Sequence, residues 1–279
     1  MIKQRLLYLL KQLGWYHFLQ GNYQSLLQYV LRTRLRLQYW PHKGKGFTCN
    51  CCGKQYEKFA PRYPAAEDKQ ALEKHHVIAD YGWHVYCPWC LSTSRERLII
   101  GILATQIPVA GKRILHLSPE PKVFAFLKQQ QAVVTSTDIT PGFYQKIDKH
   151  IQYADATQLP FPDNTFELVI GNHILEHIPN DRLAMRELYR VLQPGGRAIL
   201  QVPFSESIPN TLEDPNIRDP KQQSALFGQK DHVRIYALPD YLQRLRDAGF
   251  TVKYQLYGSF IAYFQYAIQP LEGFIHITK

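Results

Sequence analysis

Short apolar runs alternate with segments of helical spacing from residue 95 to the end of the chain. The runs have the length and β-branched content of buried strands, and the helical segments carry apolar residues on one side. We expect strands at 113–117, 132–137, 150–153, 166–170, 197–202, 251–257 and 260–266, and helices at 95–105, 121–130 and 238–248. This alternation predicts an α/β fold, a doubly wound, seven-stranded and mostly parallel sheet with helices on both faces and an antiparallel last strand.

The first 40 residues are predicted to form a separate helical extension. Residues 2–13 and 22–39 have helical apolar spacing, and Gly14 and Gly21 are expected to break the helix. One interpretation packs this extension onto the rest of the protein. The other places a basic amphipathic surface on anionic lipid, and the two are compatible.

The positive charge of the protein lies almost wholly in its N-terminal segment. The formal net charge is +10, and residues 1–56 hold nine lysines and arginines with no acid before Glu57. No apolar run reaches the ~18–20 residues of a spanning helix, and no cleavage site indicates a signal peptide. We therefore expect a cytoplasmic protein, positioned peripherally at the inner face of the membrane if the extension binds lipid.

Four of the five cysteines form two C-x-x-C pairs, which are Cys49 with Cys52 and Cys87 with Cys90. Two such turns supply four thiolates in a tetrahedral arrangement, a ligand set that favours Zn²⁺. The segment 41–94 is therefore predicted to be a zinc-ribbon-like module, with a structural role because four protein ligands leave no open position. Cys51 and the intervening histidines are expected not to bind the metal. Free thiols or a redox pair are the alternatives.

Acidic residues follow two of the predicted strands. Asp138 comes directly after the strand at 132–137, and Asp155 follows the strand near 150–153. The carboxyl ends of parallel strands meet at one edge of a sheet, where nucleoside ligands bind. An aspartate at a strand end also serves as a helix cap or turn residue, so each acid alone is a weak signal.

The stretch from Tyr153 to Phe204 closely resembles the second half of class I S-adenosylmethionine-dependent methyltransferases of the type 11 group. The cysteine pairs, Arg95–Leu98, the His-Leu-Ser-Pro-Glu-Pro loop and Phe227–Tyr236 are similar to a bacterial branch of that group. The resemblance covers roughly residues 47–265. It implies a Rossmann-like methyltransferase domain over 95–279 that binds S-adenosylmethionine, and it carries little information on the methyl acceptor.

The resemblance also implies which residues contact the cofactor. Asp138 is expected at the ribose hydroxyls and Asp155 at the adenine edge. The group's glycine-rich loop is replaced here by His116–Pro121, so either side chains of this loop hold the methionyl group or the cofactor site has decayed. The full set of expected cofactor-binding residues is His116, Ser118, Glu120, Asp138, Asp155, Ala156 and Asn172.

The acceptor side is expected after the strand at 166–170 and in the segment 205–236, a proline-interrupted stretch predicted to be a lid. His173 is the first candidate for the base that removes the acceptor's proton, and His232 is the second. Glu176 with His177 is expected to be structural. The candidates for substrate binding are Asp231, Arg234 and Tyr236, and the alternative role of these residues is to fasten the lid to the domain.

The residues after the fourth predicted strand limit which classes of methylation reaction are expected. Gly171-Asn172-His173 is not the (D/N)-P-P-(Y/F) sequence of amino-methylating nucleic-acid enzymes, and no cysteine nucleophile lies there. We expect methylation of a hydroxyl or amine on a small molecule or a saccharide, including a lipid-linked glycan. The alternatives are an RNA methyltransferase, which the near-neutral charge of residues 57–279 disfavours, and a non-catalytic binding protein on the same fold.

Overall fold

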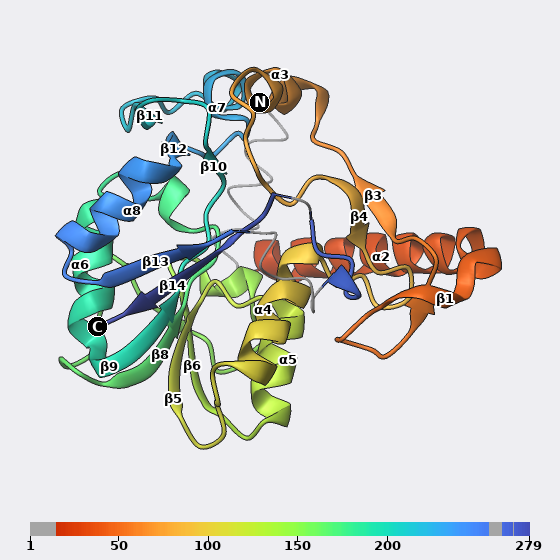
Figure 1. Cartoon of the computed structure of the whole chain (residues 1–279), viewed down its shortest axis with the longest axis horizontal. Coiled ribbons are helices and arrows are strands. Elements are labelled where there is room, and N and C mark those ends of the chain that lie inside the picture. The colour runs from red at the N-terminus through yellow and green to blue at the C-terminus, as the bar shows by residue number, and fades with distance from the viewer. Residues whose placement is uncertain (1–14, 257–263, 270) are drawn as a thin grey trace.

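The computed structural model describes residues 15–256, 264–269 and 271–279. A seven-stranded sheet runs through the main domain in the order β13-β14-β9-β8-β5-β6-β7 (Figure 1). Its strands are β5 (Arg113–Leu117), β6 (Val133–Asp138), β7 (Gln152–Tyr153), β8 (Phe166–Ile170), β9 (Leu192–Ile199), β13 (Thr251–Gln255) and β14 (Phe274–Thr278). Strands β5 to β9 pair in parallel, and β14 is antiparallel to both of its neighbours. The predicted doubly wound α/β fold class is confirmed.

Two layers of helices cover the sheet. Helices α4 (Ser94–Thr105) and α5 (Pro121–Gln129) pack on one face, and α6 (Asp181–Val191) and α8 (Leu238–Asp247) on the other (Figure 1). Capping side chains stabilise the first turns of α4 and α6. Thr93 and Glu96 form a capping box at the start of α4, and the Asn180 side chain accepts a hydrogen bond from Leu183 N in α6. Both faces of the sheet are therefore buried, as its continuous apolar strands require.

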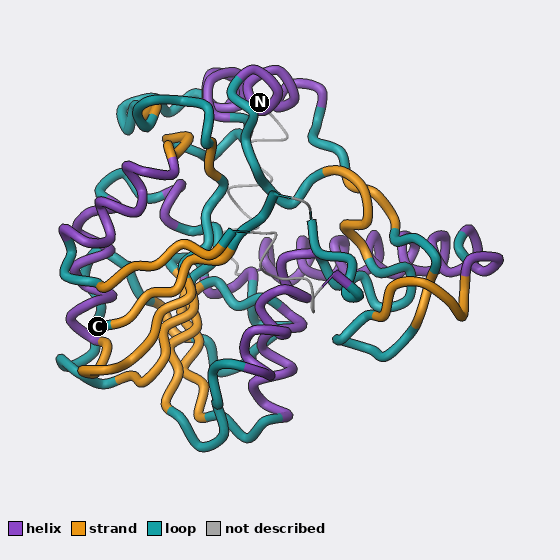
Figure 2. Tube along the Cα trace, in the orientation of Figure 1, coloured by secondary structure: helices purple, strands orange, loops and turns teal. Residues whose placement is uncertain are grey.

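The N-terminal part is built around short strands (Figure 2). Helix α2 (Trp15–Gln38) leads through η1 (Trp40–His42) into the antiparallel pair β1 (Lys43–Thr48) and β2 (Gln55–Tyr56). A second antiparallel pair, β3 (Ala60–Arg62) and β4 (Gly82–Tyr86), is separated by α3 (Ala66–Lys74). The small core of this module takes side chains from α2, the strands and the cysteine turns.

The predicted lid is an ordered group of short elements. It contains β10 (Phe204–Ser205), β11 (Leu212–Glu213), α7 (Pro220–Phe227) and β12 (Arg234–Ala237), and the three strands pair in the order β10-β12-β11. Helix α7 packs against α3 of the N-terminal module (Figure 1). Gly228 ends α7 with a φ of +75°, and a Cβ atom there would overlap Leu72 of α3. The lid and the N-terminal module thus meet above the sheet.

Two predicted features are wrong. Helix α2 continues through Gly21, where one glycine costs a helix only about 1 kcal/mol relative to alanine. The strand expected at 260–266 falls partly outside the described residues, and its described end, 264–266, forms a turn. The seventh strand is β14 instead, which buries apolar residues against β9 and β13. The predicted helix at 2–13 lies outside the described residues. Among the helices that the structure describes, none is both long and apolar enough to cross a bilayer.

The Arg97 guanidinium joins three parts of the structure. Arg97 lies in α4 and is fully buried. It donates hydrogen bonds of 2.6–3.0 Å to five main-chain carbonyl groups, those of His84, Val85, Ser92, Tyr266 and Ala267. A buried cation is tolerated only when its donors are satisfied. The cysteine module, α4 and the segment before β14 therefore depend on the same side chain.

Replacing Arg97 with methionine should destabilise this junction. Methionine retains much of the bulk but leaves five buried carbonyls without their donor, and removing one partner from a buried charged network costs about 3–5 kcal/mol. We expect the free energy of unfolding to fall by that amount in denaturant titrations followed by circular dichroism. The control is Arg113→Met at an exposed position, where a change under about 0.5 kcal/mol is expected. Equal stability of wild type and Arg97→Met would contradict this role.

Candidate functional site

The strand order reverses at the centre of the sheet. From β5 the chain proceeds to β6 and β7 on one side and to β8 and β9 on the other. In doubly wound folds, ligands bind at this switch point, outside the carboxyl ends of the strands. The loops that follow β5, β6 and β8 therefore define the first part of the candidate site.

The loop after β5 contacts the acid at the end of β6. Ser118 Oγ donates to Asp138 Oδ2 over 2.6 Å, and Thr140 N donates to Asp138 Oδ1 over 2.6 Å. Ser118 has a φ of +46°, in the left-handed region that favours glycine. The loop thus keeps the backbone conformation of a glycine turn although it contains no glycine. Each carboxylate oxygen retains a lone pair for a further donor, such as a ribose hydroxyl.

Glu120 lies in the loop after β5 and connects it to the loop after β8. Its Oε1 forms an ion pair of 2.7 Å with Arg95 Nε, and its Oε2 accepts from Asn172 Nδ2 over 2.7 Å. Asn172 in turn accepts from Gln201 N. The Glu120 carboxylate is therefore already balanced by an arginine. Asn172 and Glu120, both expected at the cofactor, are in direct contact, and their role in cofactor binding stays a prediction.

His116 is buried at the end of β5. Its Nε2 accepts a hydrogen bond from Glu120 N, and its Nδ1 has no hydrogen-bond partner. Burial lowers the pKa of His116 to about 3. The imidazole is therefore neutral at physiological pH, and it shapes the loop without contributing charge to the site.

Asp155 and Ala156 follow β7 as predicted. Asp155 is half-buried, and its Oδ1 accepts from both Thr157 N and Thr157 Oγ1. This is an Asx-type turn, so the side chain holds its own loop in shape. Ala156 packs against the main core. Whether these two residues meet an adenine edge remains a prediction of the resemblance.

A polar cavity of about 170 Å³ lies beside these loops, over the end of β8. The N-terminal module contributes Arg62 and Asp80, α4 contributes Arg95, the loop after β8 contributes His173, and the lid contributes His232. Arg95 lines this cavity and also binds Glu120 in the cofactor loop. The Arg95 side chain therefore connects the cavity with the loop after β5 at the switch point.

The two predicted base candidates both lie at this cavity, on either side of Glu176. His173 Nδ1 is 3.4 Å from Glu176 Oε1, and His232 Nε2 is 4.0 Å from the same oxygen. Burial lowers the pKa of His232 to about 3 and the pKa of His173 well below its usual value, and it raises the pKa of Glu176. His173 and His232 are therefore neutral at physiological pH, the form in which an imidazole accepts a proton.

The three predicted substrate-binding residues have different positions. Arg234 is buried and donates to the carbonyls of Leu175, Ile178 and Pro179 and to Glu213. Tyr236 is also buried, and its hydroxyl donates to Asp181 Oδ2 over 2.6 Å. Neither lines the cavity, so the contacts of both residues favour the alternative role of fastening the lid. Asp231 is exposed beside His177 at the cavity rim.

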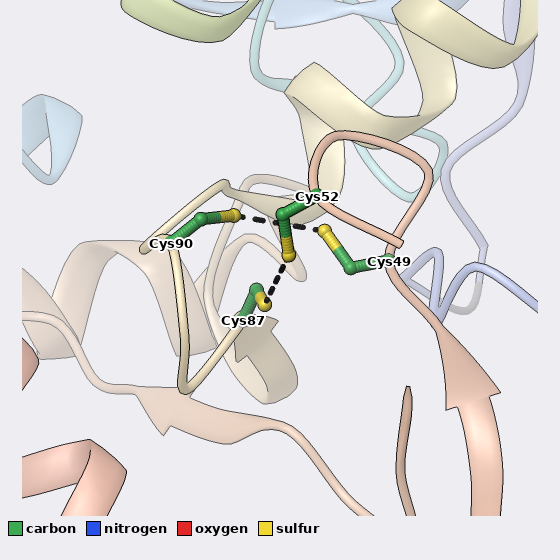
Figure 3. A group of neighbouring side chains, drawn as sticks. All are labelled: Cys49, Cys52, Cys87 and Cys90. Carbon is green, nitrogen blue, oxygen red and sulfur yellow. Dashed lines mark hydrogen bonds between the residues drawn. The ribbon is translucent and has the colours of Figure 1, made fainter. Parts of the chain in front are cut away.

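The four paired cysteines converge on one point. The Sγ atoms of Cys49, Cys52, Cys87 and Cys90 all lie within 4.8 Å of one another, and they point inward from two facing loops (Figure 3). The Cys49–Cys90 and Cys52–Cys87 sulfur distances are 3.7 and 3.8 Å. A tetrahedral ion with metal–sulfur bonds of about 2.3 Å requires sulfur separations of about 3.8 Å. Cys51 is outside this set. The donor set therefore fits a tetrahedral zinc ion.

Two residues at the site were not predicted from the sequence. Arg95 belongs to the stretch Arg95–Leu98 that carries part of the family resemblance, but its partner Glu120 is 25 residues away, so no local pattern reveals the pair. Glu176 was expected to be structural. Its spacing of three positions from His173 was the available signal, because residues three positions apart share one side of a helical turn.

Comparison with known proteins agrees with this geometry. Residues 120–200 match the family described as a methyltransferase domain, the type 11 model. The chain is 35% identical over 102 residues to the demethylmenaquinone methyltransferase of Clavibacter sepedonicus, covering 33% of this chain and 42% of that protein. It is 35% identical over 162 residues to the 27-O-demethylrifamycin SV methyltransferase of Amycolatopsis mediterranei, covering 53% and 57%. The chain thus spans about half the length of these relatives.

Among solved structures, an S-adenosylmethionine-dependent methyltransferase from Mesorhizobium loti aligns with a TM-score of 0.47 and 14% identity. The alignment covers 66% of this chain and 97% of that one. The sheet order is that of a Rossmann-like methyltransferase fold, and residues 120–200 within it match a methyltransferase family model. The matched model is that of the type 11 group, to which the sequence shows a resemblance.

Proposed function

We propose that this protein is an S-adenosylmethionine-dependent methyltransferase that modifies a hydroxyl or amine of a small molecule or saccharide. The observation that carries the proposal is the contact between Ser118 and Asp138 at the switch point. The same loop reaches the wall of the polar cavity through the Glu120–Arg95 ion pair. Ser118 retains the left-handed turn that allows the backbone to approach a ligand, and Asp138 presents a carboxylate where a ribose is expected. These features support a functional cofactor site over a decayed one.

The residues of this chain divide the work of the reaction. Asp138 and Ser118 would hold the nucleoside, and Glu120 with Asn172 would fix the loop that faces the methionyl group. When bound, S-adenosylmethionine supplies an activated methyl group. His173 is then the residue placed to accept the proton of the acceptor, because it lines the cavity next to Asn172. The lid and the N-terminal module both contribute side chains to the wall of that cavity.

Asp138→Asn should weaken cofactor binding. The substitution preserves shape but removes the charge that strengthens hydrogen bonds from ribose hydroxyls, each worth about 1.5–3 kcal/mol. In calorimetric titrations with S-adenosylmethionine we expect an affinity about 10- to 100-fold lower than that of the wild type. The control Asp163→Asn removes an exposed carboxylate far from the switch point in sequence and should bind as the wild type does. Folded wild-type protein that gives no binding heat would refute the proposed function.

We also propose that the four clustered cysteines bind one structural Zn²⁺ ion. The sulfur spacing and the soft thiolate donors support it, and the cluster is held by the same module that walls the acceptor cavity. Its role would be to maintain the β1–β2 and β3–β4 pairs, which are too short to be stable alone. Zinc would therefore act on the cavity only through the fold.

Cys52→Ser and Cys51→Ser provide a matched test of that site. Cys52→Ser removes a ligand and should reduce bound zinc well below one equivalent per chain, with a fall of about 10 °C in the thermal midpoint. Cys51→Ser changes a neighbouring thiol outside the cluster and should leave the zinc content unchanged. Zinc content by elemental analysis and thermal scans measure both. Equal zinc loss in the two variants would count against the assigned ligand set.

We further propose that α2 binds the surface of an anionic membrane, which would bring the protein to a lipid-linked acceptor. Apolar side chains along α2 are at least half exposed, and they are Tyr23, Leu26, Leu27, Tyr29, Val30 and Leu37. The same N-terminal segment carries positive charge without an acid before Glu57. Apolar exposure combined with basic charge is the property of an interfacial helix.

Leu37→Glu should impair membrane binding. Leu37 is 74% exposed, and a carboxylate there removes apolar contact and repels anionic lipid. In co-sedimentation assays with phosphatidylglycerol vesicles we expect wild type to bind and the variant to bind several-fold less, while pure phosphatidylcholine vesicles retain neither. Leu226→Glu places the same charge on α7 and should bind as wild type. Equal sedimentation of Leu37→Glu and wild type would exclude this surface.

A further inference from the structure

Three side chains converge in the acceptor cavity at a point that the proposed reaction does not yet use. Glu176 and His177 lie in η3 (Leu175–His177) after β8, and His232 lies in the lid just before β12. The closest ligand atoms of the three all lie within 4.8 Å of one another. Two imidazole nitrogens and one carboxylate oxygen at such spacing form a donor set suited to a first-row divalent metal ion.

Glu176 supplies an independent observation. Its side chain is about 1% exposed, and neither carboxylate oxygen has a hydrogen-bond partner. A buried carboxylate without partners is costly, so native proteins pair such groups with donors or metal ions. Asp80, the other acid in the cavity wall, also lacks hydrogen-bond partners, but its carboxylate lies 3.8 Å from the Arg62 guanidinium. Glu176 is thus an acid whose environment calls for a cation.

The two histidines are oriented as metal ligands usually are. His177 Nδ1 is 3.1 Å from the carbonyl oxygen of Asp231, which leaves Nε2 as the nitrogen with a free lone pair. His232 Nε2 lies 4.0 Å from Glu176 Oε1. The two rings meet edge to face with centroids 4.7 Å apart. A main-chain contact like that of His177 fixes the tautomer and direction of a ligand imidazole.

We propose that Glu176, His177 and His232 bind one divalent transition-metal ion, and that this ion receives an oxygen of the methyl acceptor. The second part rests on the proposed methyltransferase function, and the first does not. Three protein ligands leave open coordination positions, unlike the four-cysteine cluster. His232 is thereby a metal ligand and not a second base, while His173 remains beside the ion through its contact with Glu176.

A metal ion at this position would select the acceptor class. A divalent cation attracts hydroxyl and phenolate oxygens and lowers the pKa of a bound hydroxyl, whereas it repels a protonated amine. Arg62 and Arg95 in the cavity wall act in the same direction. The expected acceptor is therefore a hydroxyl compound, with neighbouring oxygens that can occupy two open positions.

Manganese titration of the zinc-loaded, full-length protein tests the metal site. Mn²⁺ is a hard ion that thiolates bind poorly, so it discriminates against the cysteine cluster. Free Mn²⁺ is measured by its electron paramagnetic resonance signal. We expect one Mn²⁺ per wild-type chain, with affinity about 10-fold or more weaker in Glu176→Gln and in His177→Asn. The matched control Glu73→Gln, at an exposed glutamate in α3, should bind as the wild type does.

The variants should remain folded. Glutamine has the shape of Glu176 without its buried charge, and His177 is at the cavity rim with 30% of its side chain exposed. Wild-type affinity no higher than that of Glu176→Gln would overturn the metal site, as would an equal loss in Glu73→Gln. Glu176→Gln and His177→Asn should bind S-adenosylmethionine with an affinity within about 2-fold of that of the wild type.

Open coordination is tested with the Mn²⁺ complex itself. Water-proton relaxation should show exchangeable water on bound Mn²⁺, and catechol, which offers two neighbouring oxygens, should displace it. Bound Mn²⁺ without exchangeable water would overturn the acceptor role. A wild-type protein that binds Mn²⁺ but not S-adenosylmethionine would refute the methyltransferase proposal while upholding the metal site, so the two failures are distinguishable.

Discussion

The structure depends on one buried guanidinium group. Arg97 donates hydrogen bonds to carbonyl groups from two segments that are far apart in the sequence. They are those of residues 84, 85 and 92 and those of residues 266 and 267. These carbonyls belong to segments that form few regular ladders with each other, so side-chain donors replace the missing main-chain pairs. Two residues before it, Arg95 extends from the same helix into the candidate site. Helix α4 thus contacts both the cysteine module, through Arg97, and the loop after β5, through Arg95.

The loop after β5 and the polar cavity are connected by a series of polar side chains. Arg95 binds Glu120, Glu120 binds Asn172, and the next residue along the chain is His173. Charge is balanced pairwise along this path, which permits burial of so many ionisable groups close together. Only Glu176 stands outside the balance among the cavity acids discussed above. In the site, Arg95, Glu120 and Asn172 are therefore paired with one another and fix the loops. Glu176 lacks hydrogen-bond partners and can still bind a ligand.

The sequence allowed the sheet to be predicted well and the cavity poorly. Strand and helix periods are local, so β5, β8 and α8 were located nearly to the residue. The cysteine pairs were also predictable, because their spacing carries its own geometry. Arg95 with Glu120, by contrast, is a pairing across 25 residues that only the packing of α4 on α5 creates. The last strand was misplaced because an aromatic run resembles a strand whether or not it pairs, and tertiary contacts alone distinguish the two.

The packing of α7 on α3 has a consequence for the order in which the protein is made. Gly228 fits beneath Leu72, two residues separated by more than half of the chain. During synthesis the N-terminal module leaves the ribosome first, and its α3 face and the Arg97 donors must wait for residues that emerge much later. The nascent module consequently exposes the side of α3 that α7 covers in the finished fold. The same late closure makes the acceptor cavity one of the last features of the molecule to form.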